Sequence, residues 1–382
     1  MSVSTTAQEV CVDTHPVLGC GFHSVIGLLP ARSVEEGLMR SITGMLSAVL
    51  VCFASATINA QNAATSGSQQ PAAWHDPSPH TVQFITVDKD VKLEVLDWGG
   101  SGRPVVLLAG GGDTAHVFDN FALKLTPSFH VYGITRRGFG QSGFSPEGYG
   151  ADRLGDDVLA VLDALNLKKP VLVGHSLGGE ELSSVATRYP SRVTALVYLE
   201  AAYPYAFDNG KGPTWKEFED AKKLMPRAPP PSESDPGLAS FAALQQACTR
   251  ALGLTYPEAE LRQQFTATPD GRVGKQRDFP GNAVMLQGMK KYANIPVPAL
   301  AIFAIPHAHA KWMTDSADPT VRDAAKAFWA TEDALTTRQA MAFEDGVSTA
   351  HVVRLRAADH YVYLSNEADV LREMRAFISS LP

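Results

Sequence analysis

The chain has 382 residues, of which 45% are hydrophobic and 19% are charged, a composition typical of a globular protein with enough length for one large core. Its formal net charge is −7 and it carries no run of lysine or arginine, which argues against nucleic acid and anionic membranes as partners. The length alone suggests two or three domains of about 150 residues. Because α/β domains often exceed that size, we expect one core domain that carries an insertion.

The first 60 residues predict a leader. A basic start at Met39 and Arg40 is followed by an uncharged apolar run at 42–56, which ends near Ala60. This order is typical of a secretory signal peptide, and the run is shorter than the roughly 20 residues of a membrane span. We expect translation to start at Met39, cleavage near Ala60, a linker at 61–80, and a mature chain that is periplasmic or secreted, without stable membrane insertion. A helix retained as an anchor is the alternative.

The positions of the cysteines bear on disulfide formation. Three of the four cysteines lie in the predicted leader, and Cys248 alone remains in the predicted mature chain. We therefore expect no intrachain disulfide there and a Cys248 that packs as a small apolar side chain.

The region after residue 80 has the pattern of a parallel sheet. Residues 82–87 and 91–96 alternate between polar and apolar, which predicts two strands joined by a tight turn. Short apolar runs then alternate with segments of helical spacing. In chain order these are strands at 104–108 and 130–134, a helix at 151–165, a strand at 171–173, a helix at 177–189 and a strand at 193–199. The alternation predicts a doubly wound, mostly parallel sheet of the α/β class with helices on both faces.

Residues 204–294 interrupt this alternation. They contain three consecutive prolines at 229–231, short helical patterns such as 241–252, and scattered aromatic residues. We expect a mostly helical cap that lies over the core. The alternation then resumes with a strand at 299–304, a helix at 319–343, a strand at 351–355 and a helix at 367–378.

A serine motif lies between a predicted strand and a predicted helix. Residues 174–178 are Gly-His-Ser-Leu-Gly, which fits the pattern G-x-S-x-G in the structural context that it requires. Such a turn raises the hydroxyl of Ser176 above the sheet. It also places the amide of Leu177 at the N-terminus of the helix, where it points toward a developing oxyanion. We predict that Ser176 is a nucleophile; a glycine-rich packing turn is the alternative.

A second amide donor is expected from the loop after the strand at 104–108. Residues 109–112 are Ala-Gly-Gly-Gly, and glycine suits a backbone that must approach a substrate. The N–H of Gly111 is the best candidate for that donor, and a plain turn is the alternative.

The general base is predicted to be His360. It follows the last predicted strand and precedes the last helix, and loops at the carboxyl ends of parallel strands are where such sheets bind ligands. The neighbouring Asp359 is poorly placed to orient that imidazole, and His175 lies inside the serine motif, where we expect it to pack. His360 is favoured over four other histidines, which are His116, His130, His307 and His309.

The pair His307 and His309 also has the spacing of two metal ligands. Without a third histidine or a matching carboxylate this is a weak metal site, so we expect pocket lining or a solvated loop. The sequence has no phosphate-binding loop, no dinucleotide fingerprint and no metal-binding cysteine cluster. We therefore expect no cofactor and no metal.

Taken together, these motifs make the chain resemble the α/β-hydrolase superfamily over residues 81–382. The resemblance rests on GHSLG at 174–178, AGGG at 109–112, RGFGQSG at 137–143 and the C-terminal segment 358–378. It implies an eight-stranded, mostly parallel sheet formed by 81–203 and 295–382, a helical cap at 204–294, and a catalytic triad of serine, histidine and a carboxylate. It says little about the substrate.

The acid of that triad departs from the usual pattern. Many members of the superfamily carry it just after the seventh strand, but here residues 304–312 contain no carboxylate and Asp315 lies too far along. The sixth predicted strand ends in Glu200, from which a carboxylate can reach the same imidazole. The zearalenone lactone hydrolases resemble this chain in having a glutamate there. We therefore assign Glu200 as the acid; a glutamate that caps the strand or pairs with arginine is the alternative.

The residues and the resemblance together predict a serine hydrolase that cleaves an ester or lactone of a small to medium apolar substrate. C–C bond hydrolysis, acyl transfer and perhydrolysis on the same triad stay open. A serine at the nucleophile position argues against epoxide hydrolases and haloalkane dehalogenases, which need an aspartate. An alternative of another class is a binding or sensing protein that retains the fold. The oligomeric state is left open.

Overall fold

The structure is a computed structural model that describes residues 74–227, 236–286 and 288–382. Asp76–Pro382 belongs to one compact unit. The predicted leader with its signal peptide and most of the predicted linker at 61–80 lie outside the described residues. The bounds of that linker stay a prediction. Among the described residues, no helix combines the length and apolar character needed to cross a membrane.

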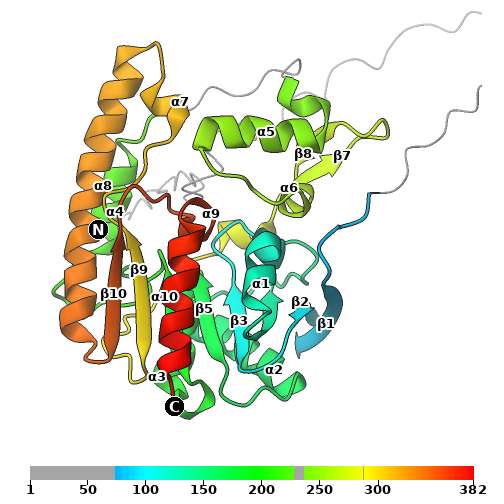
Figure 1. Cartoon of the computed structure of the whole chain (residues 1–382), viewed down its shortest axis with the longest axis vertical. Helices are drawn as coiled ribbons and strands as arrows, with labels where there is room; N and C mark the ends of the chain where they lie inside the picture. Colours follow the sequence, from blue (N-terminus) through cyan, green and yellow to red (C-terminus); the bar gives the residue numbers. More distant parts are fainter. Residues whose placement is uncertain (1–73, 228–235, 287) are drawn as a thin grey trace, which may run out of the picture. The chain divides into compact units, whose positions relative to one another are not determined.

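One eight-stranded sheet organises the described chain, in the order β1-β2-β4-β3-β5-β6-β9-β10 (Figure 1). The strand β2 pairs antiparallel with β1 and β4, and the other neighbouring strands are parallel. The strands are β1 (Thr81–Asp88), β2 (Val91–Gly99), β3 (Pro104–Leu108), β4 (His130–Ile134), β5 (Val171–His175), β6 (Ala195–Leu199), β9 (Ala299–Ala304) and β10 (Ala350–Leu355). The predicted doubly wound, mostly parallel sheet is confirmed.

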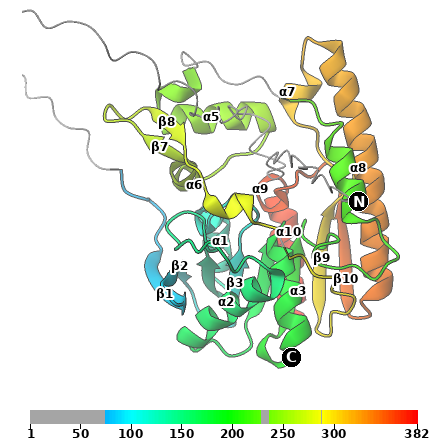
Figure 2. The same ribbon diagram turned by 180° about the vertical axis from the view of Figure 1, so that it is seen from behind.

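Helices cover both faces of the sheet (Figures 1 and 2). The helices of this part of the chain are η2 (Ala115–Phe118), α1 (Asp119–Leu125), α2 (Ala151–Ala164), α3 (Gly178–Arg188), η3 (Pro190–Arg192), α7 (Lys311–Thr314), α8 (Pro319–Gly346), α9 (Val362–Ser365) and α10 (Glu367–Ser380). The short α7 lies beyond the end of the sheet, next to α5 and α8 (Figure 1). Alternate residues of β3 enter two clusters of buried side chains. Val105 and Leu107 pack with residues of α1 and α10, whereas Val106 and Leu108 pack with residues of α2 and α3. Burial on both faces explains why this strand is apolar throughout.

A set of shorter elements lies between β6 and β9. They are α4 (Trp215–Lys222), η4 (Pro236–Ala239), α5 (Phe241–Leu252), α6 (Glu258–Gln264), β7 (Phe265–Ala267), β8 (Val273–Gln276) and η5 (Pro280–Ala283). The helix α5 has the predicted bounds because the side chain of Ser240 caps its first turn and Gly253, at φ 85°, ends it. The antiparallel pair β7 and β8 is an addition to the predicted helical pattern. The division of the chain into a core and a cap at 204–294 stays a prediction.

Candidate active site

Ser176 lies on the turn that joins β5 to α3. Its φ is 47°, a left-handed conformation that costs free energy for a residue with a Cβ and persists only where the surroundings impose it. The glycines of the motif allow this close passage. A Cβ on Gly174 would lie 2.7 Å from the carbonyl carbon of Gly178, and a Cβ on Gly178 would lie 2.7 Å from the carbonyl oxygen of Leu108. The turn therefore presents the serine at the carboxyl end of the sheet.

The carboxylate of Glu200 is fully buried at the end of β6. Its Oε1 accepts a hydrogen bond from the amide of Ala304 at 2.6 Å, and its Oε2 accepts one from the hydroxyl of Tyr203 at 2.5 Å. Nδ1 of His360 lies 3.2 Å from the same Oε2. The structure thus brings Glu200 to His360, as predicted, whereas Asp315 is exposed at the end of α7.

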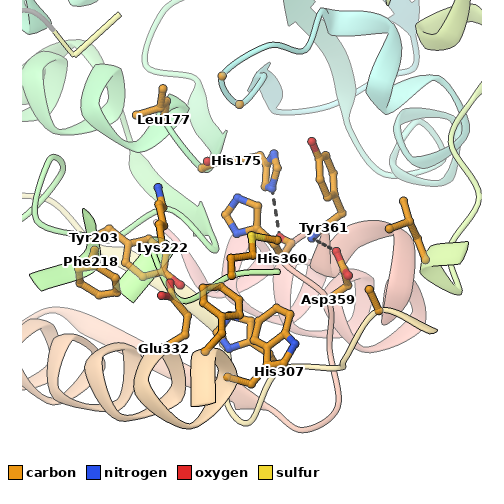
Figure 3. A pocket seen from close by; sticks show the side chains of 18 of the residues that line it. His175, Leu177, Tyr203, Phe218, Lys222, His307, Glu332, Asp359, His360 and Tyr361 are labelled. Carbon is orange, nitrogen blue, oxygen red and sulfur yellow. Dashed lines mark hydrogen bonds between the residues drawn. The ribbon is translucent and has the colours of Figure 1, made fainter. Parts of the chain in front are cut away.

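His360 is held by its backbone as well as by its ring (Figure 3). Its carbonyl oxygen accepts a hydrogen bond from Nε2 of His175 at 3.1 Å, and the two imidazole rings lie 4.8 Å apart. Burial, followed by the positive charge that His360 can carry, holds the pKa of His175 well below its usual value, so this imidazole is neutral. Asp359 accepts a hydrogen bond from the amide of Tyr361 at 3.0 Å and so stabilises its own loop. Among the described residues, no hydrogen bond joins His360 to Ser176.

A second imidazole contacts the same carboxylate, which the sequence did not indicate. Nε2 of His307 lies 3.5 Å from Oε2 of Glu200, and its Nδ1 lies 2.7 Å from Oδ1 of Asp333 in α8. Burial alone would lower the pKa of His307, but the contacts with Asp333 and Glu200 outweigh it and raise that pKa to about 10. Burial opposes ionisation of Glu200 too, yet its contacts with His307 and His360 keep its pKa well below the usual value. The site therefore has an ionised carboxylate between two imidazoles.

The glycine loop after β3 lies against the serine turn. A Cβ on Gly110 would come within 3.1 Å of Cβ of Ser176, and a Cβ on Gly111 would lie 2.8 Å from Cδ1 of Leu177. The guanidinium of Arg136 donates hydrogen bonds to the carbonyl oxygens of residues 109 and 110, at 2.9 and 3.1 Å. These contacts fix the backbone of the loop next to Ser176 and Leu177.

The loop that carries the predicted base His360, the base loop, is also joined to the glycine loop. The hydroxyl of Tyr361 donates a hydrogen bond of 2.9 Å to Oδ2 of Asp113, and both residues are buried. Burial, and then the nearby charge of Glu260, raises the pKa of Asp113 well above its usual value. The serine turn, the base loop and the glycine loop therefore form one hydrogen-bonded assembly.

The five site residues predicted from the sequence all lie at one pocket at this end of the sheet. Ser176, Leu177, Gly111 and His360 line it, and Glu200 lies beneath His360. The pocket has about 1020 Å³ of empty space, including the part open to solvent. Its apolar walls come from the segment between β6 and β9 and from α7 and α8. The apolar residues that line it are Tyr205, Trp215, Phe218, Met225, Leu252, Met313, Phe328 and Trp329.

Two charged side chains interrupt the aromatic wall (Figure 3). Nζ of Lys222 lies 4.8 Å from the centroid of the ring of Trp215, a cation–π contact. Glu332 is buried, its Oε2 has no hydrogen-bond partner among the described residues, and burial raises its pKa. The pocket therefore combines a large apolar surface with an available polar pair, which suits a ligand that is mainly apolar.

A family model for the alpha/beta hydrolase fold matches residues 103–367, which is more than half of the chain. The chain therefore belongs to the α/β-hydrolase fold family, and the predicted superfamily is confirmed.

Curated relatives point to hydrolases and haloperoxidases. The chain is similar to the AB hydrolase superfamily protein YisY of Bacillus subtilis, with 32% identity over 41% of this chain and 60% of that protein. It is similar to the bifunctional esterase/perhydrolase DCH of Acinetobacter calcoaceticus, with 34% identity over 32% of this chain and 45% of that protein. It is also similar to the non-heme chloroperoxidase of Streptomyces lividans, with 33% identity over 34% of this chain and 48% of that protein. The chain thus spans about half the length of these relatives.

Solved structures share the fold at low sequence identity. E-2-(acetamidomethylene)succinate hydrolase superposes with a TM-score of 0.56 and 18% identity, over 79% of this chain and 100% of that protein. The esterase EaEST of Exiguobacterium antarcticum superposes with a TM-score of 0.52 and 18% identity, over 78% of this chain and 100% of that protein. At this identity the likeness extends to the fold alone.

Proposed function

We propose that the chain is a serine hydrolase that cleaves a carboxylic ester or lactone of a small to medium apolar substrate through an acyl-enzyme. The observation that carries this proposal is the contact of 3.2 Å between Nδ1 of His360 and the buried carboxylate of Glu200, at the same pocket as Ser176. A carboxylate at Nδ1 favours the tautomer whose Nε2 is free to accept a proton. The esterase among the relatives supports the same class of reaction.

In the proposed mechanism, the imidazole of His360 accepts the hydroxyl proton of Ser176 as the serine oxygen attacks the substrate carbonyl. The amides of Gly111 and Leu177 donate hydrogen bonds to the oxyanion. Glu200 stabilises the imidazolium, which then protonates the leaving alcohol, and a water molecule repeats the sequence to release the acid. The hydrogen bond between Ser176 and His360 forms in the substrate complex, since such contacts often tighten only when substrate binds.

The pocket supports an apolar substrate with one polar substituent. Its aromatic walls bury the apolar part. Lys222 and Glu332 lie on the same wall, so a hydroxyl or carbonyl group of the substrate finds a donor and an acceptor there. We infer that these two side chains select the polar substituent and that the walls select size.

The activity test is hydrolysis of p-nitrophenyl esters of increasing acyl length and of lactones. We expect Ser176→Ala to lower kcat by at least about 10³-fold, because it removes the nucleophile. Ser191→Ala is the matched control, since Ser191 is exposed in η3, and it should retain wild-type turnover. Equal turnover by wild type and Ser176→Ala contradicts the proposal. Tight binding of an ester without turnover by the wild type favours a binding protein instead.

A second pair of variants tests the assignment of the acid. Glu200→Gln keeps the shape of the side chain but removes the charge that stabilises the imidazolium, so we expect kcat to fall by about 10²- to 10⁴-fold. Asp315→Asn should leave kcat unchanged, because Asp315 is exposed at the end of α7. The reverse result would show that the acid is assigned wrongly.

Perhydrolysis is a second candidate activity, favoured by the matches to an esterase/perhydrolase and a chloroperoxidase. In this reaction hydrogen peroxide replaces water as the nucleophile that releases the acyl group, and the product is a peracid. Peracid formation from a short carboxylic acid and hydrogen peroxide is measured by bromination of monochlorodimedone. Activity that disappears in Ser176→Ala supports this second reaction, and equal bromination with and without the protein excludes it.

We also propose that the mature chain is exported after cleavage near Ala60. The support is the apolar run at 42–56 in the sequence. N-terminal sequencing of the chain from the periplasm or the medium tests this. A new N-terminus near residue 61 supports export, whereas an intact N-terminus on cytoplasmic protein contradicts it.

A further inference from the structure

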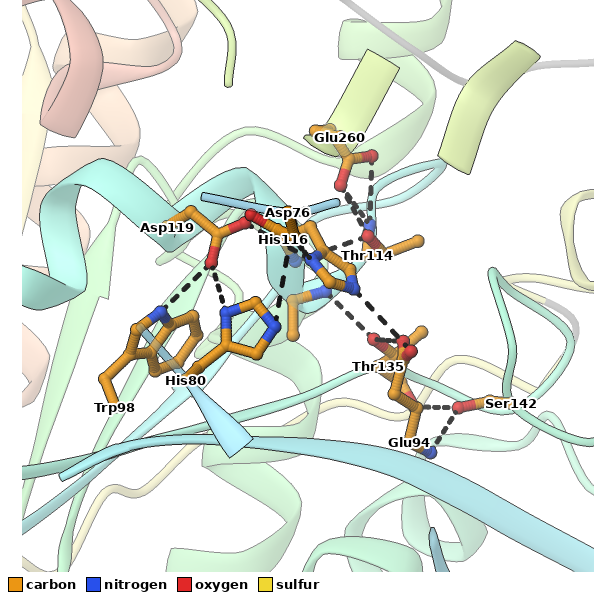
Figure 4. Close-up of polar contacts among 11 residues, drawn as sticks. Asp76, His80, Glu94, Trp98, Thr114, His116, Asp119, Thr135, Ser142 and Glu260 are labelled. Carbon is orange, nitrogen blue, oxygen red and sulfur yellow. Dashed lines mark hydrogen bonds and ion pairs between the residues drawn. The ribbon is translucent and has the colours of Figure 1, made fainter. Parts of the chain in front are cut away.

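A cluster of two histidines and two aspartates lies outside the pocket lining (Figure 4). Asp76 and His80 belong to the segment that precedes β1, His116 lies in η2, and Asp119 is the first residue of α1. Each of the four side chains contributes one nitrogen or oxygen atom, and these four atoms all lie within 4.8 Å of one another. Two stretches of chain about 35 residues apart in sequence therefore converge on one point.

Nitrogen and oxygen atoms of the four side chains approach one another closely across the cluster. Nδ1 of His116 lies 3.2 Å from Oδ2 of Asp76 and 3.2 Å from Oδ2 of Asp119. Nδ1 of His80 lies 3.0 Å from Oδ1 of Asp119, and its Nε2 lies 3.9 Å from Oδ2 of Asp76. Nitrogen and oxygen ligands at about 2.1 Å from a tetrahedral zinc ion are separated by about 3.4 Å.

Two atoms of the cluster are close to partners without being hydrogen-bonded. Neither Nδ1 of His80 nor Oδ2 of Asp76 has a hydrogen-bond partner among the described residues, although both are buried. The side chain of His80 is only 4% exposed. Buried polar atoms that approach one another closely, but are not aligned for hydrogen bonds, are costly unless something else satisfies them. An ion between them satisfies both.

The surroundings have the second layer of contacts that metal ligands need. Nε2 of His116, the nitrogen that faces away from Asp76 and Asp119, lies 3.6 Å from Oε1 of Glu94. Oδ1 of Asp119 accepts a hydrogen bond of 3.0 Å from Nε1 of Trp98. The carboxylate at Nε2 of His116 and the indole N–H at Oδ1 of Asp119 fix the orientation of both side chains.

We propose that Asp76, His80, His116 and Asp119 bind one Zn²⁺ ion that fastens the segment before β1 to η2 and α1. Two imidazoles and two carboxylates suit zinc better than calcium or magnesium, which prefer oxygen ligands. Four protein ligands leave no open position, so the site is structural rather than catalytic. The proposal departs from the sequence-based expectation of no metal, because only folding brings these four residues together.

The alternative occupant of the cluster is a proton. Burial would lower the pKa of His116, but the carboxylates of Asp119, Asp76 and Glu94 outweigh it and raise that pKa to about 12. A protonated His116 can therefore pair with these carboxylates in the metal-free chain, and zinc must displace that proton to bind. An experiment must separate a zinc site from such a network.

The test measures zinc content and thermal stability of the full chain. After treatment with a chelator and gel filtration, the protein is given Zn²⁺, freed of excess metal and analysed by mass spectrometry of the elements. We expect the wild type to hold one more equivalent of zinc than the variants His80→Gln and Asp76→Asn. We also expect zinc to raise, and EDTA to lower, the melting temperature of the wild type but not of these variants. The difference between variants is decisive because it removes zinc that binds elsewhere on the chain from the comparison.

His130→Gln is the matched control. His130 also pairs with an aspartate, with Nε2 2.8 Å from Oδ1 of Asp97, but lies outside the cluster, so this variant should bind zinc like the wild type. Glu94→Gln keeps all four ligands and should weaken zinc binding by about 10- to 100-fold. Zinc retained equally by the wild type, His80→Gln and Asp76→Asn, or a wild-type melting temperature that neither zinc nor EDTA moves, leaves only the ion-pair network and overturns the proposal.

Discussion

Replacement of His307 by glutamine removes the positive charge that lies next to the carboxylate of Glu200. The same carboxylate contacts His360. Both imidazoles approach Oε2 of Glu200, at 3.5 Å and 3.2 Å, so their nitrogens cannot be more than about 7 Å apart. Two unit charges at that separation repel each other by about 2 kcal/mol at an effective dielectric constant of about 20. In the wild type, the cation at His307 therefore opposes a second positive charge on the other side of the same carboxylate.

The expected result is a shift of the acid limb of the pH profile of kcat/KM. This limb reports the protonation of the general base in the free enzyme. Because His307 has a pKa of about 10, it is charged throughout the acid and neutral range in the wild type. Its loss removes the repulsion that opposes a second positive charge at the site, so activity disappears at a higher pH. A repulsion of about 2 kcal/mol corresponds to a shift of about 1.5 pH units.

The measurement is hydrolysis of one p-nitrophenyl ester across the pH range, with two comparison variants. Asp333→Asn keeps the imidazole of His307 but removes a carboxylate that favours its charge, so the limb should move in the same direction by less. His309→Gln is the control, since His309 stacks on Trp329 with 5.4 Å between ring centroids and has no contact with Glu200 among the described residues. An acid limb that stays in place or moves to lower pH in His307→Gln refutes the reasoning.

Two further predictions concern stability. Gly179→Ala places a Cβ 2.1 Å from the backbone carbonyl oxygen of Ala201, so we expect urea denaturation to show a loss above about 3 kcal/mol or no folded protein. Gly150→Ala, whose Cβ would meet nothing nearer than 3.9 Å, should cost below about 1 kcal/mol, and similar losses would contradict the packing argument. Burial, and then the charge of Glu181, raises the pKa of Glu180 from its ordinary 4.5 to about 8. Its Oε1 has no hydrogen-bond partner among the described residues. As pH rises, Glu180 therefore ionises first in the unfolded chain, and stability is lost between about pH 4.5 and pH 8. Glu180→Gln should raise the free energy of unfolding at pH 8 by about 1–3 kcal/mol, with little gain at pH 4. A gain of the same size at both pH values would show that ionisation is not the cause.

The sequence predicted the central strands well because two-sided burial leaves a continuous apolar run. The bounds of β3 and β9 agree with the predicted ranges. Short elements were missed: α1 has seven residues and β7 has three, too few to show a period. The pattern of residues along the chain also gave no sign of the hairpin of β7 and β8.

Within the site, a residue was predictable where a local motif or a strand end placed it. Glu200 was assigned from its position at the end of a strand, and the structure has it in contact with His360. The contact between His307 and Glu200 depends on how two strand ends meet, and the partner of His307, Asp333, lies in the middle of a long helix. Asp76 and His80 were assigned to a linker because loop residues show no periodicity. Such contacts exist only in three dimensions.

The bond between Tyr361 and Asp113 has a consequence for how the protein is inactivated. It joins the loop of His360 to the glycine loop, and His175 joins the loop of His360 to the serine turn. Loops that are tied to one another and to the buried strands do not open independently at low cost. The site should therefore stay intact until the whole unit melts. Heat inactivation and the loss of secondary structure should then follow a single curve, so the working lifetime of the enzyme equals the lifetime of its fold.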